Sequence, residues 1–383
     1  MVFYIDHSIH DVLNSRELFE DEAIFFANLA NMYRMGTCYL CGNINSLDTL
    51  SQQLGNPSGN IYQSIKKSYS ESGAVMEVVH TVMVLTFQEY PSPDNLPTIL
   101  QVQNKAIYIP ISVAQKWSLS KKCCLLAENL SDCTFYERVA TYYCIKHRIR
   151  GIQVCFHHEN GGGNTTCNVL RKCVQEEKEL TLCIIDSDKK YGISEEYPNE
   201  PARGDTFHRA HRVSIELCED ENLPPHALKP LDVHEIENLI PQQVLKQLRK
   251  ELPAMDRGLN LLEKLSKIEC GSPILYYDFK MGFPLLKVGP QRSYWKEILL
   301  ALGGTEADIP PLNQSKDDRD DRNDPYKLFF PPLSNNNLLT RANLLLDDAT
   351  LPTLRLDTYL LPHWEQIGEL MLTWGCAGLP IYA

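Results

Sequence analysis

The sequence predicts an α/β protein with a central parallel sheet and flanking helices, on three observations. Short apolar runs at 123–127, 152–156 and 180–185 read as buried strands. Segments with helical spacing, 131–147 and 164–178, separate them, with Ser131 as the expected N-cap of the first. The connections are short, which is typical of a doubly wound sheet. We expect additional N-terminal and C-terminal regions around this sheet.

We divide the chain into three segments. Residues 1–120 are expected to form an N-terminal α/β or helical domain of unknown role. Residues 121–245 hold the central sheet, and 246–383 form a mostly helical C-terminal region. An acidic run near 314–325 predicts a disordered loop, because its alternating charges leave little to bury.

The N-terminal segment carries its own signals. Residues 2–5 and 39–41 read as strands, and 17–34 as an amphipathic helix. The stretch 55–60 is rich in turn residues. The run 75–87 fits either a strand or a buried helix.

The remaining segments are less regular. Residues 189–228 read as a polar excursion, which leads to an apolar segment at 228–233. From 242 to 267 the spacing is helical, and a final helix is expected to end near Trp374.

Composition limits the function. With 383 residues the chain is long enough for two or three domains. A net charge of −12 disfavours binding to a polyanion unless metal ions and local basic patches supply the attraction.

The compartment is expected to be the cytoplasm. No apolar stretch reaches the roughly 20 residues that a membrane span needs, and the first residues do not read as a signal peptide. Thirteen cysteines, many in apolar runs, read as reduced thiols in the core.

Acidic residues follow the apolar runs of the predicted sheet. Glu128 follows the first run, Asp186 and Asp188 follow the third, and Glu235 and Glu237 follow the apolar segment near 230. Because parallel strands bring their carboxyl ends to one edge of a sheet, we expect these side chains to converge there.

Converging carboxylates repel one another unless a cation lies between them. Mg²⁺ or Mn²⁺ prefers such oxygen ligands, and one or two such ions can activate a water molecule against a phosphodiester. We take all five acids as candidate catalytic residues and all except Glu237 as candidate metal ligands.

The order of these motifs resembles the Toprim domain over about 120–245. Glu128-Asn129-Leu130-Ser131-Asp132, a glycine turn, Asp186-Ser187-Asp188 and Glu235-Ile236-Glu237-Asn238 carry the resemblance, with Asn129 where the family often has glycine. The most similar members are Toprim-like nucleases of bacterial anti-phage systems, including the overcoming-lysogenization-defect type.

The resemblance implies a magnesium-dependent endonuclease acting on DNA or RNA as a defence effector. It implies an acid/base role for Glu128 and magnesium binding by Asp186 and Asp188. It also implies an ABC-type ATPase or another sensor as partner, which must be a separate protein because this chain has no phosphate-binding loop. Homo-oligomerisation stays open.

Nearby basic residues are candidates for contacts with nucleic-acid phosphates. Lys189 and Lys190 follow the Asp-x-Asp pair, and Arg203, Arg209 and Arg212 lie in the polar excursion. Ordinary surface positions are the alternative for all five.

Two other functions stay open. A strand ending in Asp-x-Asp also begins the site of haloacid-dehalogenase-type phosphatases, with Asp186 as nucleophile. Alternatively, the chain is a non-catalytic binding or assembly subunit derived from a Toprim module.

Four smaller motifs have ordinary interpretations beside functional ones. Gly161-Gly162-Gly163 is either a flexible connection or a close approach to phosphate or to the carboxylates. Asp132 either favours a helix N-terminus or joins the site. Cys38 and Cys41 lack a second pair at zinc spacing, and His7 and His10 read as polar surface residues.

Overall fold

The computed structural model describes most of the chain, namely residues 1–88, 105–119, 121–193, 199, 201–251, 256–268, 272–280, 282, 290–308, 330, 333 and 337–381. The chain divides into two compact units. Unit 1 comprises Met1–Ile184, Ala210–Lys229 and Glu365–Ala383, and unit 2 comprises Ile185–Arg209 and Pro230–Trp364. The N-terminal region and most of the central sheet therefore share one unit. The acidic run near 314–325 lies outside the described residues.

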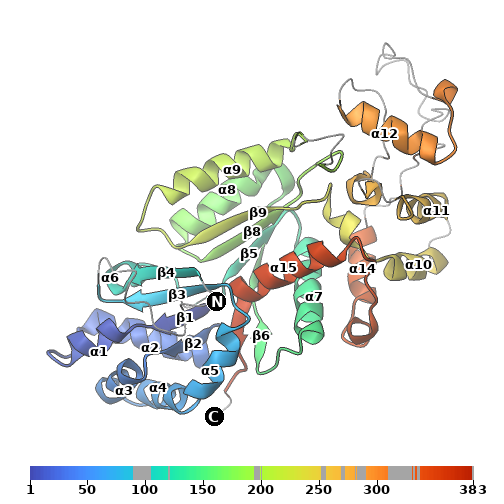
Figure 1. The fold of residues 1–383 in the computed structure, drawn as a ribbon. Coiled ribbons are helices and arrows are strands. Elements are labelled where there is room, and N and C mark those ends of the chain that lie inside the picture. Colours follow the sequence, from blue (N-terminus) through green and yellow to red (C-terminus); the bar gives the residue numbers. More distant parts are fainter. Residues whose placement is uncertain are drawn as a thin grey trace. The chain divides into compact units, whose positions relative to one another are not determined.

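The first sheet of unit 1 has the strand order β2-β1-β3-β4, and all neighbouring strands pair in parallel (Figure 1). Its elements in chain order are β1 (Val2–Ile5), α1 (His7–Leu13), α2 (Glu20–Arg34), β2 (Tyr39–Gly42), α3 (Ile44–Gln53), α4 (Ser58–Lys67), α5 (Tyr69–Met76), β3 (Thr81–Thr86), β4 (Lys105–Pro110) and α6 (Ile111–Ala114). The N-terminal segment is therefore α/β. Both predicted strands are present, and the ambiguous run 75–87 holds the end of a helix and a strand. The helix α4 begins inside the predicted turn.

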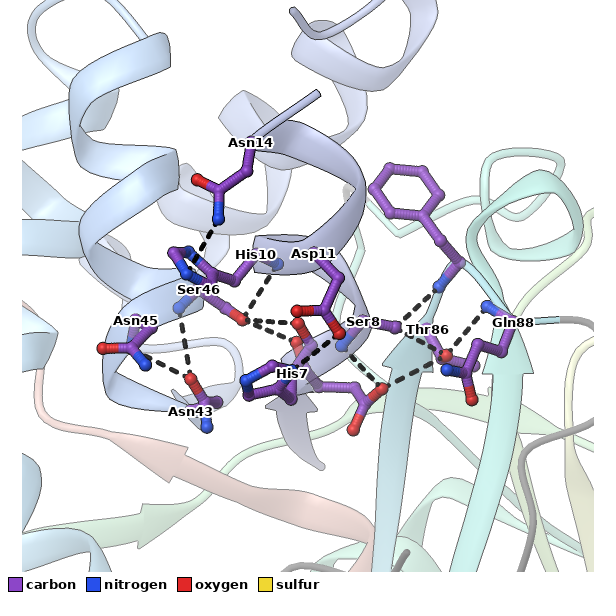
Figure 2. A network of polar contacts seen from close by, with 12 residues as sticks. His7, Ser8, His10, Asp11, Asn14, Asn43, Asn45, Ser46, Thr86 and Gln88 are labelled. Atoms are coloured by element: carbon purple, nitrogen blue, oxygen red, sulfur yellow. Dashed lines mark hydrogen bonds and ion pairs between the residues drawn. The ribbon is translucent and has the colours of Figure 1, made fainter. Parts of the chain in front are cut away.

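Polar side chains join the carboxyl ends of β1 and β3 (Figure 2). Asp6 Oδ2 accepts hydrogen bonds from the Ser8 backbone N–H (3.1 Å) and from Thr86 Oγ1 (3.3 Å), and the Ser8 and Thr86 hydroxyls lie 2.8 Å apart. Ser46 Oγ donates to Asp6 O (2.7 Å) and so ties the beginning of α3 to the same edge. One carboxylate oxygen of the buried Asp6 is thereby satisfied within the fold.

The second sheet of unit 1 has the order β7-β5-β8-β9, and β7 and β8 both pair in parallel with β5. Its elements are β5 (Cys124–Ala127), α7 (Leu130–Lys146), β6 (Ile152–Val154), β7 (His157–Asn160), η3 (Gly163–Thr165), α8 (Thr166–Arg171), the π-helical turn η4 (Lys172–Glu176), β8 (Thr181–Ile185), α9 (Asp205–Cys218) and β9 (His226–Pro230). The chain moves from β5 to one side and then returns past it to β8. Right-handed crossovers then place α7 and α8 on opposite faces of the sheet, as Figure 1 shows. The predicted α/β class with a parallel sheet and flanking helices is confirmed.

One predicted strand belongs elsewhere. The apolar run 152–156 supplies β6, which pairs antiparallel with β10 (Cys376–Gly378), while the strand beside β5 is the polar segment His157–Asn160. This strand lies at the edge of the sheet, where its side chains are only partly buried. An edge strand does not need apolar side chains on both faces, so the apolar pattern alone misplaced it.

Two further elements differ from the sequence prediction. The excursion 189–228 contains α9, which buries Ala210, Val213 and Leu217 at helical spacing, and it leads into β9. The N-cap of α7 is Asn129 rather than Ser131, because the Asn129 backbone N–H donates to Asp132 Oδ2 (2.9 Å) in a capping box. Asp132 therefore has the capping role.

Unit 2 is mainly helical beyond the loops that follow β8 and β9. Its elements are η5 (Ile236–Leu239), α10 (Gln242–Glu251), α11 (Asp256–Leu265), η7 (Pro273–Tyr276), α12 (Pro290–Ala301), η8 (Glu306–Asp308), α14 (Leu338–Leu345), η10 (Leu351–Thr353) and the first residues of α15 (Leu361–Gly375). The single helix expected over 242–267 is thus two helices, and the final helix ends one residue beyond Trp374. None of the helices in the described part of the chain combines the length and hydrophobicity needed to span a bilayer.

Candidate functional site

Two loops of unit 2 are joined by hydrogen bonds directly after β8 and β9. The Ile236 backbone N–H donates to Asp186 Oδ1 (3.0 Å), and the Asp188 backbone N–H donates to His234 O (2.9 Å). Ser187 Oγ donates to Val233 O. These bonds fix the position of Asp186 relative to the segment that carries Glu235 and Glu237.

Asp186, Glu235 and Glu237 form a carboxylate cluster. Each offers an oxygen, and the three oxygens lie within 4.8 Å of one another. As whole residues, Glu235 and Glu237 are only 5% and 9% exposed. Burial raises the pKa of Glu235 above its ordinary value, and the negative charge of Glu237 raises it further. Ionising all three acids is therefore costly without a cation.

Lys280 supplies a positive charge to this carboxylate cluster. Its Nζ lies 3.0 Å from Glu235 Oε2 and 3.3 Å from Glu237 Oε1. Partial burial by itself lowers the pKa of Lys280, but the carboxylates of Glu237 and Glu235 outweigh this effect and hold it above its ordinary value. One ammonium group balances part of the charge of three carboxylates.

The carboxylate cluster retains capacity for a cation. Glu237 Oε2 is buried and accepts no hydrogen bond from the described residues. A buried oxygen without a partner is costly, and hard cations such as Mg²⁺ take oxygen ligands. The donors present therefore fit Mg²⁺ or Mn²⁺.

Glu235 also belongs to a second group with His234 and Asp278, whose ligand atoms lie within 4.8 Å of one another. Asp278 Oδ2 is 3.5 Å from His234 Nε2 and 3.8 Å from Lys190 Nζ. Glu235 Oε1 accepts a hydrogen bond from the Phe279 backbone N–H (2.9 Å). The segment 278–280 thus orients Glu235 and supplies its counter-charge.

Asp188 adopts a different position from Asp186. Its backbone has φ of 56°, a left-handed conformation that Asp tolerates better than most residues. A Cβ atom on Gly204 would lie 1.8 Å from Asp188 Oδ2, so this carboxylate packs directly against the Gly204 backbone before α9. The group of three acids within 4.8 Å does not include Asp188.

Glu128 belongs to unit 1, where it directly follows β5 and is half-buried. Two glycines of the triplet lie close to it. The Gly162 backbone N–H donates to Glu128 O (2.9 Å), and a Cβ atom on Gly163 would lie 3.8 Å from Glu128 Oε2. Gly162 and Gly163 have φ of 68° and 63°, which favours glycine. The triplet therefore makes the close backbone approach that was one of its two interpretations.

The predicted basic residues lie in varied surroundings. Lys189 is buried with its Nζ 3.6 Å from Asp232, and Lys190 Nζ lies 3.0 Å from His234 Nε2. The Arg203 guanidinium lies 4.6 Å from the centre of the Phe207 ring. Arg209 and Arg212 are exposed on α9.

The remaining sequence candidates have structural surroundings. Cys38 and Cys41 are buried free thiols, and the metal-compatible groups among the described residues do not include them. His7 is exposed and lies 2.8 Å from Asp11, while His10 is half-buried and lies 2.8 Å from Thr49 Oγ1.

Sequence reasoning missed Lys280, Asp278 and His234. His234 adjoins Glu235, so its neighbourhood was visible in the sequence. Asp278 and Lys280 come from a segment about 45 residues further on, inside the region predicted to be helical. No motif marks them, because only the tertiary fold brings them to Glu235.

Comparisons with known proteins do not assign the chain to a family. No protein-family model, no curated protein and no solved structure matched it.

Proposed function

We propose that the chain is a metal-dependent, Toprim-like endonuclease that hydrolyses phosphodiester bonds in DNA or RNA. The observation that carries the proposal is the carboxylate cluster, in which Asp186 directly follows the parallel strand β8 and meets Glu235 and Glu237 from the segment after β9. In open parallel sheets, ligands usually bind beyond the carboxyl ends of the strands. The three acids come from two separate segments of the sequence and are buried or half-buried. Because Glu237 Oε2 has no hydrogen-bond partner among the described residues, they favour a divalent cation over a purely structural role.

In this proposal the three carboxylates hold Mg²⁺ or Mn²⁺. When bound there, such an ion would lower the pKa of a coordinated water molecule and stabilise negative charge on phosphate oxygens. Glu235 is oriented for this role by the Phe279 backbone N–H, and Asp186 by the Ile236 backbone N–H. Lys280 balances negative charge beside the ligands, and its ammonium group would also attract a phosphate oxygen.

The remaining roles follow from the Toprim resemblance. Glu128 would carry the proton in acid/base chemistry, held by the glycine triplet. The exposed Arg209 and Arg212 would bind phosphates. A cytoplasmic anti-phage effector that depends on an ABC-type ATPase or another sensor is the biological setting we propose.

A cleavage assay tests the proposal. The full chain is incubated with plasmid, single-stranded DNA and total RNA in the presence of Mg²⁺, Mn²⁺ or a chelator. We expect metal-dependent cutting that Asp186→Asn and Glu237→Gln abolish, while the surface control Glu263→Gln cuts normally. Cutting in chelator, or unchanged cutting by Asp186→Asn, would show that the carboxylate cluster is not the site.

One observation favours a second candidate, the non-catalytic binding subunit. Lys280 already neutralises part of the carboxylate cluster without any metal. If the ammonium is the resident cation, the protein will neither bind Mn²⁺ at the carboxylate cluster nor cut any of these substrates. Metal titration separates the two candidates before any partner is known.

A further inference from the structure

Unit 1 contains a cavity of about 640 Å³ that is separate from the carboxylate cluster. Its lining includes Tyr33 of α2, Tyr39 of β2 and Glu71 of α5. The loop between α7 and β6 adds Arg148 and Arg150. All of its lining residues lie within unit 1. Its volume is within the range of small-molecule sites, about 300–1,000 Å³.

The cavity presents two unengaged positive charges. Arg148 and Arg150 are exposed, and among the described residues neither guanidinium takes part in an ion pair or side-chain hydrogen bond. The adjacent His147, by contrast, pairs with Glu365 at 2.7 Å. Two free guanidinium groups two positions apart suit an anion with several oxygens, such as a phosphate. The chain as a whole has a net charge of −12, so these two arginines form a positive patch on a negatively charged protein.

The rest of the lining suits a planar group with hydrogen-bond donors. The rings of Tyr33 and Tyr39 are 6.3 Å apart at 75°, so they form an edge-to-face corner. Aromatic faces stack on nucleobases. Glu71 and Ser68 add an acceptor and a hydroxyl to the same lining. A carboxylate repels phosphate but accepts hydrogen bonds from the amino groups of a base.

We propose that this cavity binds a nucleotide, with its phosphates on Arg148 and Arg150 and its base among Tyr33, Tyr39 and Glu71. A nucleotide is the ligand class that offers both a multiply charged anion and a planar donor-bearing ring. The proposal does not depend on the carboxylate cluster or on catalysis.

Calorimetric titration of the full chain tests the proposal, with ADP as the probe. The buffer contains a chelator, so that no divalent ion links ADP to the carboxylate cluster. Adenosine and inorganic pyrophosphate are titrated separately. We expect ADP to bind at least tenfold more tightly than either fragment.

Two variants and a control locate the site. Arg150→Ala and Arg148→Asn are each expected to weaken ADP binding about 10-fold to 100-fold, as for loss of a charged hydrogen bond. Asn is chosen at position 148 because φ there is 56°, which Asn tolerates. Arg355→Ala, at an exposed position in unit 2, is expected to leave binding unchanged.

The proposal is overturned if ADP gives no binding heat at millimolar concentration, or if both cavity variants bind it like the wild type. Equal affinity for pyrophosphate and ADP would contradict the role of the base. Equal affinity for adenosine and ADP would contradict the role of the arginines.

Discussion

Replacement of Lys280 by Met tests how the carboxylate cluster is balanced. Met keeps much of the apolar side-chain volume but removes the ammonium group, which lies 3.0 Å from Glu235 and 3.3 Å from Glu237. Without divalent metal, the remaining acids repel one another and unit 2 loses stability. With metal, the ion replaces the lost positive charge.

The magnitude follows from burial. Removing one partner of a buried ion pair costs about 3–5 kcal/mol, whereas an exposed pair contributes about 0–1 kcal/mol. The Lys280 side chain is 46% exposed, while those of Glu235 and Glu237 are 6% and 11% exposed. Solvent screening of the half-exposed lysine therefore brings the expected loss to about 1–3 kcal/mol.

The assay is thermal unfolding in chelator and in Mg²⁺. At roughly 2–4 °C per kcal/mol for a unit of this size, Lys280→Met should lower the Tm in chelator by on the order of 5 °C. Mg²⁺ at about 100 times its Kd should restore about 2.7 kcal/mol. The control is Lys296→Met, because Lys296 is 39% exposed and lies 2.9 Å from Glu306 outside the carboxylate cluster. Equal Tm shifts for the two variants, or a Lys280→Met shift that Mg²⁺ does not reduce, would refute the reasoning.

Three further predictions concern unit 1. Gly161→Ala should lower the free energy of unfolding, measured in urea, by about 1–3 kcal/mol through overpacking, because the new Cβ would lie 2.3 Å from Thr166 Oγ1. The control Gly73→Ala in α5 should not lower it, because its Cβ would meet nothing within 4 Å. Burial lowers the pKa of His226, so the unfolded state takes up a proton that the folded state resists, and stability should fall as the pH drops through about 6.5. His226→Gln should flatten that slope between pH 7.5 and 5.5, and an unchanged slope would exclude this histidine. Burial raises the pKa of Cys38 to about 12, so in native protein at pH 8 iodoacetamide should alkylate the exposed Cys218 and leave Cys38 unmodified. Labelling is measured by mass spectrometry, and equal labelling of the two cysteines would contradict this.

The elements that the sequence predicted well are those whose own residues determine them. β5 and β8 are short, fully buried apolar strands, and such runs are recognisable without tertiary information. β7 was misplaced because an edge strand tolerates His157, His158 and Glu159 on partly buried faces. The helix α9 was missed because only a narrow stripe of it is apolar.

The candidate site was predictable only in part, for a related reason. The positions of Asp186, Glu235 and Glu237 after apolar segments indicated that they converge, since parallel strands end at a shared edge. Asp188 itself has a left-handed backbone, which places its carboxylate against Gly204, and alternation along a strand gives no sign of this conformation. The pairing of Lys280 with Glu235 depends on how the segment 272–280 packs, which local sequence does not encode.

Direct measurement of Mn²⁺ binding tests the central claim that Asp186, Glu235 and Glu237 hold a divalent ion. Free Mn²⁺ is followed by electron paramagnetic resonance during titration of the full chain and of Glu237→Gln, which keeps the shape of the side chain but removes its charge. We expect saturable binding to the wild type and at least tenfold weaker binding to Glu237→Gln. Equal binding by the two proteins, or none by the wild type, would contradict the account.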